Sequence, residues 1–166
     1  MKRRIVLISS VILLPILLLS SCKDSGGVFT HAELTLVLDD SFEERESEDF
    51  DLLLSNGTVA VSVTRLSFVA AFNQGIPDTY TAKGFGAFFM HQSGKSDEIF
   101  VEGDVPYYTY TEKTEKNELF YTVTFYRSKN AYFIVSYATP AENGEEHLES
   151  FLNFAKAAYF NDSTSV

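Results

Sequence analysis

The chain of 166 residues carries 23 acidic and 13 basic side chains, which give a net charge of −10 at pH 7, and it contains three histidines and one cysteine. A surface of this sign repels nucleic acids and other polyanions, so we expect neither DNA nor RNA as a partner. One cysteine excludes a disulfide within the chain, and an aromatic content of 14% without Trp favours a sheet-rich core.

The first 21 residues are typical of a bacterial export signal. Three basic residues at positions 2–4 precede an apolar run over 5–19, which is shorter and more interrupted than the roughly 20 apolar residues of a stable membrane span. The run leads into Leu19-Ser20-Ser21-Cys22, which resembles a lipobox. The resemblance implies a signal peptide over residues 1–21 and a lipidated Cys22 as the first residue of the mature chain.

Lipidation of Cys22 would anchor the protein to a bilayer. Two acyl chains, each contributing about 0.8 kcal/mol per buried CH₂, hold a protein on a membrane for its lifetime. The alternative is an ordinary secretory signal in which Cys22 is incidental. The sequence favours lipidation, because Cys22 is the only cysteine and stands where the modification requires one. We therefore expect an extracytoplasmic protein attached to a bacterial membrane.

Removal of the signal leaves 145 residues with ten basic and 23 acidic side chains, a net charge of −13. This length is enough for one domain with a single core. We expect the lipidated Cys22 and a short tether to occupy residues 22–31, with Gly26-Gly27 as the flexible point. A single domain is expected over 32–160 and a polar tail over 161–166.

The predicted domain opens with a strand and an acidic segment. Ala32 to Leu38 alternates, with Leu34 and Leu36 on one face, which predicts a strand. Asp39 to Asp51 then holds eight acidic side chains around Arg45. Clustered carboxylates can bind Ca²⁺, but this segment lacks the alternating ligands, central Gly and terminal Glu of a calcium loop. We interpret it as a solvated loop and leave cation binding open.

A hairpin is predicted next. Its strands are Phe50–Ser55 and Thr58–Leu66, and the turn Asn56-Gly57 favours type I′, in which both residues take positive φ. Three alternating valines define the inward face of the second strand: Val59, Val61 and Val63.

Helical spacing replaces alternation after residue 67. Pro77-Asp78 can open a helix, and apolar residues then recur at near-helical intervals, so we expect a helix over Pro77–Gln92. Gly84 and Gly86 weaken this helix by about 1 kcal/mol each relative to Ala.

Two short strands are expected at Asp97–Glu102 and Val105–Thr111, separated by Gly103-Asp104. Pro106 limits the second of them to an edge or a strand start, because proline has no amide proton for a ladder. The second strand carries aromatic side chains on both faces: Tyr107, Tyr108 and Tyr110.

The longest alternating pattern is the hairpin Glu118–Thr139, whose arms are joined by the polar turn Ser128-Lys129-Asn130, where Asn can take positive φ. On each arm three residues spaced by two share a face. They are Tyr121, Val123 and Phe125 on the first arm, and Phe133, Val135 and Tyr137 on the second. We interpret this hairpin as the core of the fold.

A final helix is expected to follow. Thr139-Pro140-Ala141-Glu142 has the form of a capping box, although Gly144 can delay the regular helix to about Glu145. Apolar residues at spacings of three and four then form a stripe that packs on the sheet: Leu148, Phe151, Leu152, Ala155 and Tyr159.

Together these features resemble the PsbP-like fold. The likeness rests on the order of the elements, on the aromatic strands YYTY (107–110) and ELFYTVTFYRSKNAYFIVSYAT (118–139), and on the Thr-Pro-Ala-Glu entry to the last helix. It covers about Glu33–Phe160. The resemblance implies an α+β fold with an antiparallel sheet of about six to seven strands and helices packed on its faces. It also implies an accessory role, docking on a larger partner, without shared catalytic residues.

No catalytic, cofactor-binding or metal-ligating residue is assigned from the sequence, so Cys22 is the only assigned site. His31, His91 and His147 lack metal-ligand spacing, and no Gly-x-Ser-x-Gly elbow, dinucleotide loop or phosphate loop occurs. Carboxylates scattered in the sequence can still pair in space for catalysis.

Three hypotheses follow. The first is a non-catalytic binding or accessory module for an envelope protein or a small ligand. Its candidate contact residues are Tyr107, Tyr108, Tyr110 and Tyr126. Each of these tyrosines is more simply a half-buried strand residue. The second hypothesis is an envelope enzyme with a carboxylate- or His-based site, and the third is a structural component that assembles through an apolar patch.

Overall fold

The computed structural model describes residues 27–96, 98–113 and 117–161. In chain order the elements are β1 (Val28–His31), β2 (Leu34–Val37), β3 (Glu43–Arg45), β4 (Leu52–Ser55), β5 (Ala60–Ser67), α1 (Phe68–Asn73), α2 (Ala82–Gln92), β6 (Phe100–Glu102), β7 (Val105–Lys113), β8 (Glu118–Arg127), β9 (Ala131–Pro140), a 3-10 turn (Ala141–Asn143), α3 (Gly144–Ala157) and β10 (Tyr159–Phe160). The predicted signal peptide, Cys22 and residues 162–166 lie outside this description. Within it, no helix is long and apolar enough to cross a membrane.

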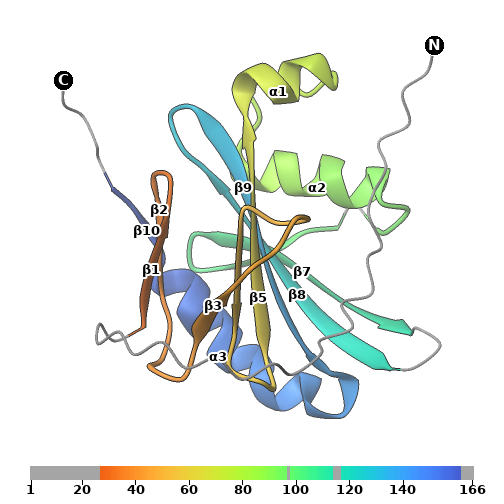
Figure 1. The fold of residues 1–166 in the computed structure, drawn as a ribbon. Coiled ribbons are helices and arrows are strands. Elements are labelled where there is room, and N and C mark those ends of the chain that lie inside the picture. The colour runs from red at the N-terminus through yellow and green to blue at the C-terminus, as the bar shows by residue number, and fades with distance from the viewer. Residues whose placement is uncertain (1–26, 97, 114–116, 162–166) are drawn as a thin grey trace.

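The elements form an α+β fold with two antiparallel sheets (Figure 1). The main sheet has seven strands in the order β3-β4-β5-β9-β8-β7-β6, and a smaller sheet has the order β1-β2-β10. Helices pack on both faces of the main sheet, α2 on one side and α3 on the other.

The hairpin of β8 and β9 lies in the interior of the main sheet, and its two apolar faces point in opposite directions. Phe125 pairs with Ile134 and Val123 with Ser136, so each odd-numbered residue of β8 lies beside an even-numbered residue of β9. The predicted set on β8 therefore shares a side with Tyr132, whereas the predicted set on β9 faces the other side. Both faces of the hairpin are consequently buried, and a different set of elements packs on each face.

Helix α2 covers the first side. Phe85 stacks on Tyr132, with ring centroids 4.2 Å apart. Gly86 lies so close to Phe125 that an added Cβ would come within 2.6 Å of the ring. Glycine is required here for close approach, which explains a residue that otherwise weakens a helix.

The predicted start of this helix is wrong. Helix α2 begins at Ala82, where the Thr81 hydroxyl accepts a hydrogen bond from the Gly84 amide at 3.1 Å. The carbonyls of Pro77 and Tyr80 instead accept bonds from the Tyr132 hydroxyl, at 2.7 and 3.2 Å. These contacts hold the segment before Thr81 outside the helix, and a threonine is a better cap than Pro77-Asp78.

Helix α3 and the small sheet cover the second side. The Tyr126 hydroxyl donates to the Ala155 carbonyl at 2.9 Å, and Phe151 stacks on Tyr137 with centroids 5.3 Å apart. The middle of the predicted stripe is buried as expected: Phe151, Leu152 and Ala155. Tyr159 has left the helix and pairs with β2 as part of β10.

The predicted capping box is wrong. Thr139 and Pro140 continue β9 and pair with β8, and the helix begins only at Gly144. Asn143 precedes it without a side-chain cap. The strand is favoured because it extends the ladder of the central hairpin and buries Thr139. The observed start at Gly144 lies one residue before Glu145, where the sequence placed the start of the regular helix.

The hairpin of β4 and β5 is confirmed, and the three alternating valines are buried. Its turn differs from the prediction. Ser55 pairs with Ala60, so four residues join the strands, and Gly57 takes a positive φ of 91° whereas Asn56 does not. The Asn56 side-chain oxygen accepts bonds from the two amides after Gly57, at 3.1 and 2.8 Å. This local bonding stabilises a wider loop in place of a type I′ turn.

The two outer strands of the main sheet differ in character. β3 lies within the acidic segment, with all three side chains exposed, so the interpretation of that segment as a loop is wrong at Glu43–Arg45. Phe42, just before it, is buried with its ring 6.1 Å from that of Phe154. Charges on an edge strand oppose pairing with another chain. At the other edge β6 pairs with β7, where Pro106 is the second residue, as expected of a proline at a strand start.

The small sheet extends the domain at both ends. Residues 28–31, which the sequence analysis assigned to the tether, form β1 and pair with β2. The hairpin turns at Ala32, whose φ is 51°. The Leu38 amide donates to the Gly27 carbonyl, and the Asn161 amide donates to the Glu33 carbonyl at 2.8 Å. The domain therefore begins before residue 32 and includes Asn161.

Candidate functional site at the exposed end of the sheet

Helix α1 was not predicted from the sequence. It directly follows β5, and the Ser67 hydroxyl caps it by accepting a hydrogen bond from the Ala70 amide at 3.2 Å. It ends shortly before Gly75, which takes a positive φ of 78°. A serine before an apolar run and a glycine after it are ordinary helix boundaries, so residues 67–75 do carry a signal for this helix.

One face of α1 packs against the domain. Ala71 is buried, and the Phe68 ring lies 5.0 Å from the Tyr132 ring. The Arg127 guanidinium lies 5.2 Å from the centre of the Phe68 ring, within range of a cation–π contact. The Phe68 amide donates to the Asn130 carbonyl at 2.9 Å. Helix α1 is therefore joined to the turn between β8 and β9 by packing and by a backbone bond.

Helix α1 also exposes two large apolar side chains. Val69 and Phe72 are 76% and 78% exposed. Because they are three residues apart on a helix, they are neighbours and form one patch, which we call the apolar tip. Figure 1 shows α1 projecting beyond the end of the main sheet. A contiguous apolar patch on a projecting element is typical of an interaction surface.

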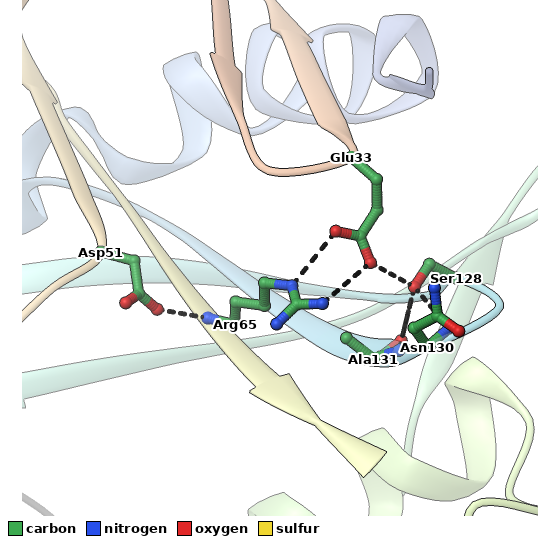
Figure 2. A network of polar contacts seen from close by, with 6 residues as sticks. All are labelled: Glu33, Asp51, Arg65, Ser128, Asn130 and Ala131. Carbon is green, nitrogen blue, oxygen red and sulfur yellow. Dashed lines mark hydrogen bonds and ion pairs between the residues drawn. The ribbon is translucent and has the colours of Figure 1, made fainter. Parts of the chain in front are cut away.

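A network of polar contacts surrounds the end of β5, from which α1 continues, as Figure 2 shows. Arg65 of β5 donates to the Glu33 carboxylate through Nε at 3.1 Å and Nη2 at 3.4 Å. The Ser128 hydroxyl donates to the same carboxylate at 2.7 Å and accepts bonds from the amides of Asn130 and Ala131, at 3.2 and 3.0 Å. The turn between β8 and β9 is therefore stabilised by the hydrogen bonds of Ser128. Asn130 does not take the positive φ that the sequence allowed for it.

This network joins segments that are distant in the sequence, namely the β1–β2 turn, β5 and the β8–β9 turn. Asp51 adds a contact by accepting a bond from the Arg65 amide at 2.6 Å. Burial acts to raise the pKa of Glu33, but the hydrogen bond from Ser128 and the ion pair with Arg65 outweigh it and hold the pKa below the ordinary 4.5. Glu33 therefore stays charged at neutral pH and fixes the strand ends from which α1 departs.

The tyrosines considered as contact residues are all half-buried: Tyr107, Tyr108, Tyr110 and Tyr126. Tyr110 stacks on Tyr121 at 4.9 Å and receives the Lys95 ammonium 4.2 Å from its ring centre. Tyr126 donates to helix α3, and burial raises its pKa to about 12. These rings are used for packing within the domain, so the simpler interpretation of the tyrosines is the better one.

The three histidines lie on separate elements of the described chain. His31, His91 and His147 lie on β1, α2 and α3 respectively. In the stretches 27–96, 98–113 and 117–161, no group of three or more His, Cys, Asp or Glu side chains could hold a metal ion.

A shallow depression lies at the end of the β8–β9 hairpin opposite to α1. It has a volume of about 430 Å³ and is open to solvent. We call it the acidic depression, and its lining residues are Asn117, Glu118, Leu119, Pro140, Ala141 and Glu142. Two carboxylates, Glu118 and Glu142, therefore stand beside apolar side chains in a hollow that is open to solvent.

Several solved structures have a similar arrangement of elements, and two of them illustrate the likeness. The cyanobacterial PsbP (CyanoP) from Synechocystis sp. PCC 6803 superposes with a TM-score of 0.53 at 14% identity, over 86% of this chain and 99% of that one. A protein from Bacteroides thetaiotaomicron superposes with a TM-score of 0.56 at 13% identity, over 84% of this chain. The present chain spans about half the length of that protein, covering 50% of it. No family model and no curated protein matches the sequence.

The fold is PsbP-like. The seven-stranded antiparallel sheet with helices on its faces confirms the fold class inferred from the sequence. At 13 to 14% identity the likeness concerns the fold alone. Within this PsbP-like domain, the apolar tip of α1 holds the two most exposed large apolar side chains of the described residues, and we take it as the candidate functional site.

Proposed function

We propose that this protein is a lipoprotein, anchored through an acylated Cys22 on the extracytoplasmic side of a bacterial membrane, that acts as a non-catalytic accessory module by docking on an envelope protein. The observation that carries the docking role is the apolar tip, Val69 and Phe72, exposed on a helix whose root is tied to three segments of the sheet. The lipobox-like motif supports the anchor.

The energetics favour docking through the tip. Burying a Val or Phe side chain that was exposed contributes about 1.5 to 3 kcal/mol. Because α1 is held by the Ser67 cap, the Phe68 packing and the Asn130 carbonyl, little conformational entropy is lost when the tip is buried by a partner. An aromatic side chain on a preordered support is a common energetic centre of a protein interface.

The anchor is tested by Cys22→Ala in the full chain. We expect the variant to leave the membrane fraction and to lose incorporation of labelled palmitate, since no other cysteine is present for acylation. A variant Ser21→Ala, which keeps a small residue before the cysteine, serves as the control and should remain in the membrane. Retention of Cys22→Ala in the membrane would contradict lipid anchoring.

The docking role is tested by the double variant Val69→Ser/Phe72→Ser. On native gels of detergent extracts we expect the unmodified chain to migrate in a complex larger than the protein alone, and the double variant to lose that complex while its circular dichroism spectrum stays unchanged. Val28→Ser is the matched control, because Val28 is also an exposed apolar residue but lies on β1, away from α1. An unchanged complex in the double variant, or an equal loss in the control, would exclude the tip as the docking surface.

A further inference from the structure

We propose that the outer face of the small sheet, β1-β2-β10, rests against the surface of the bilayer that holds the lipid anchor. This inference rests on the lipidation of Cys22 proposed above and names the face that the anchored domain turns toward the membrane. It is carried by the position of β1 directly after the anchor and by the side chains that this face exposes.

The register of the small sheet separates its two faces. Leu34 and Leu36 of β2 belong to the core, and Phe29 and Phe160 pack against it from the neighbouring strands. Since successive side chains of a strand point to opposite faces, the residues that alternate with these point outward. We call that side the outer face, and its side chains are Val28, Thr30, Thr35, Val37, Tyr159 and Asn161.

The outer face is uncharged in a strongly acidic protein. None of its side chains in the described part of the chain is acidic or basic, although the chain has a net charge of −10. Val28 and Tyr159 are each 48% exposed on it. Tyrosine is enriched where a membrane meets water, because its ring is apolar and its hydroxyl is polar. An uncharged face also avoids the repulsion between anionic lipid headgroups and the acidic remainder of the surface.

Hydrogen bonds satisfy the polar groups at the centre of the outer face. The Thr35 hydroxyl lies 2.9 Å from that of Thr30 and accepts a bond from the Asn161 side-chain amide at 2.6 Å. Thr35 is only 1% exposed as a result. Polar groups that already have partners lose little when lipid displaces water from them. The face can therefore approach the headgroups without leaving these groups unpaired.

The tether is too short to hold this face far from the membrane. Six residues lead from Cys22 to Val28, and a chain of that length spans at most about 22 Å. A domain of this size has a radius of gyration of about 14 Å, which corresponds to a width of roughly 35 Å. Strand β1 therefore stays on the membrane side of the domain. Figure 1 shows the small sheet on one flank, so this flank is the one that faces the bilayer.

Attachment to the same membrane compensates for the small area of the contact. The anchor holds the outer face close to the headgroups, so the contact forms at a high effective concentration. It also fixes the orientation of the domain, because a second contact beside the tether removes free rotation about it. The apolar tip of α1 lies outside this face and stays available for a protein partner.

The test uses the full-length lipidated protein inserted into vesicles of phosphatidylethanolamine and phosphatidylglycerol. Thr30→Cys on the outer face carries a fluorophore on its thiol, since the thiol of Cys22 is occupied by its lipid. Gln92→Cys is the matched control, because Gln92 is also exposed and polar but lies on α2, across the main sheet. Lipids with a spin-labelled headgroup quench a fluorophore beside them. We expect quenching at position 30 to exceed that at position 92 by about threefold.

Substitutions on the outer face make the test specific. The double variant Val28→Glu/Tyr159→Glu should abolish the difference between positions 30 and 92, because phosphatidylglycerol headgroups repel the added carboxylates. Val28→Leu/Tyr159→Phe, which keeps the face uncharged and apolar, should retain the difference. Circular dichroism checks that both double variants keep the fold, and the comparison of positions 30 and 92 in the otherwise native chain stands without them.

The outcomes separate this inference from the proposed anchor. Equal quenching at the two positions, in protein that floats with the vesicles, would overturn the inference and leave the anchor intact. Protein that does not float with the vesicles would contradict both. Quenching at position 30 that survives the added carboxylates would show that the tether alone brings it near the lipid, and would also overturn the inference. Protection of Thr30→Cys from a soluble maleimide in intact cells, without quenching in vesicles, would assign the face to a protein instead.

Discussion

Replacement of Phe72 by Ser should leave the stability of the domain almost unchanged, although it removes the largest side chain of the apolar tip. A fully buried Phe contributes about 1.5 to 3 kcal/mol through area removed from water. Folding covers only about a fifth of Phe72, which is 78% exposed, so the expected loss is about 0.5 kcal/mol. The helix loses little in addition, since Ser and Phe have similar helix propensities.

Phe85 provides the matched comparison. It is fully buried and stacks on Tyr132 at 4.2 Å, so Phe85→Ala should cost about 3 to 5 kcal/mol. The assay is urea denaturation of the purified protein followed by circular dichroism, with the free energies extrapolated to water. A loss above about 2 kcal/mol for Phe72→Ser would refute the reasoning, because it would mean that the ring belongs to the core of the domain.

Two further predictions concern the base of α1 and the packing of α2. Glu33→Gln should lower the free energy of unfolding by about 1 to 2 kcal/mol at pH 7, because Arg65 loses its charged partner. Since the pKa of Glu33 is lowered on folding, this contribution is present above pH 4.5, and the difference in stability between the variant and the native protein should shrink as the pH falls below that value. A difference that does not shrink would contradict the assignment. Gly86→Ala should cost about 1 to 3 kcal/mol in the same denaturation assay, because its Cβ would meet the Phe125 ring. Gly84→Ala is the control: its Cβ would find its nearest atom at 3.4 Å, so the substitution should stabilise the helix by up to about 1 kcal/mol. Equal effects of the two substitutions would contradict the close packing of α2 on the sheet.

The strands were predictable because their signals are local. Alternation over Phe50–Leu66 and Glu118–Thr139 identified two hairpins, and the structure pairs them as β4–β5 and β8–β9. The apolar stripe of the last helix was equally readable, because burial at a spacing of 3.6 needs no knowledge of the partner surface. What alternation did not provide was the register across the turn, which places the two apolar sets of β8 and β9 on opposite sides of the sheet.

Helix boundaries failed where tertiary contacts compete with local signals. Thr139-Pro140-Ala141-Glu142 has the form of a helix start, yet Thr139 and Pro140 remain in β9 because the neighbouring strand is long enough to pair with them. Pro77-Asp78 likewise has the form of a helix start, yet the Tyr132 hydroxyl binds the Pro77 carbonyl and the helix begins later. In both cases the residues that decide the outcome come from distant parts of the chain.

The candidate site was hidden for a related reason. The Glu33 carboxylate meets Arg65 and Ser128 across 32 and 95 residues, a pairing that spacing cannot reveal. Helix α1 has six residues, shorter than the window in which periodicity is measured, and its apolar residues suggest a core segment. The structure shows the reverse, since Val69 and Phe72 point into solvent.

The central claim is that the apolar tip of α1 is the surface by which the anchored protein binds a protein partner. It is tested most directly by placing a photo-crosslinking phenylalanine at position 72 of the full chain in intact cells. The same residue at position 159 is the control, since Tyr159 is 48% exposed but lies on β10. The account predicts one dominant protein adduct from position 72 and none of that mass from position 159. No adduct at position 72, or the same adducts from both positions, would contradict it.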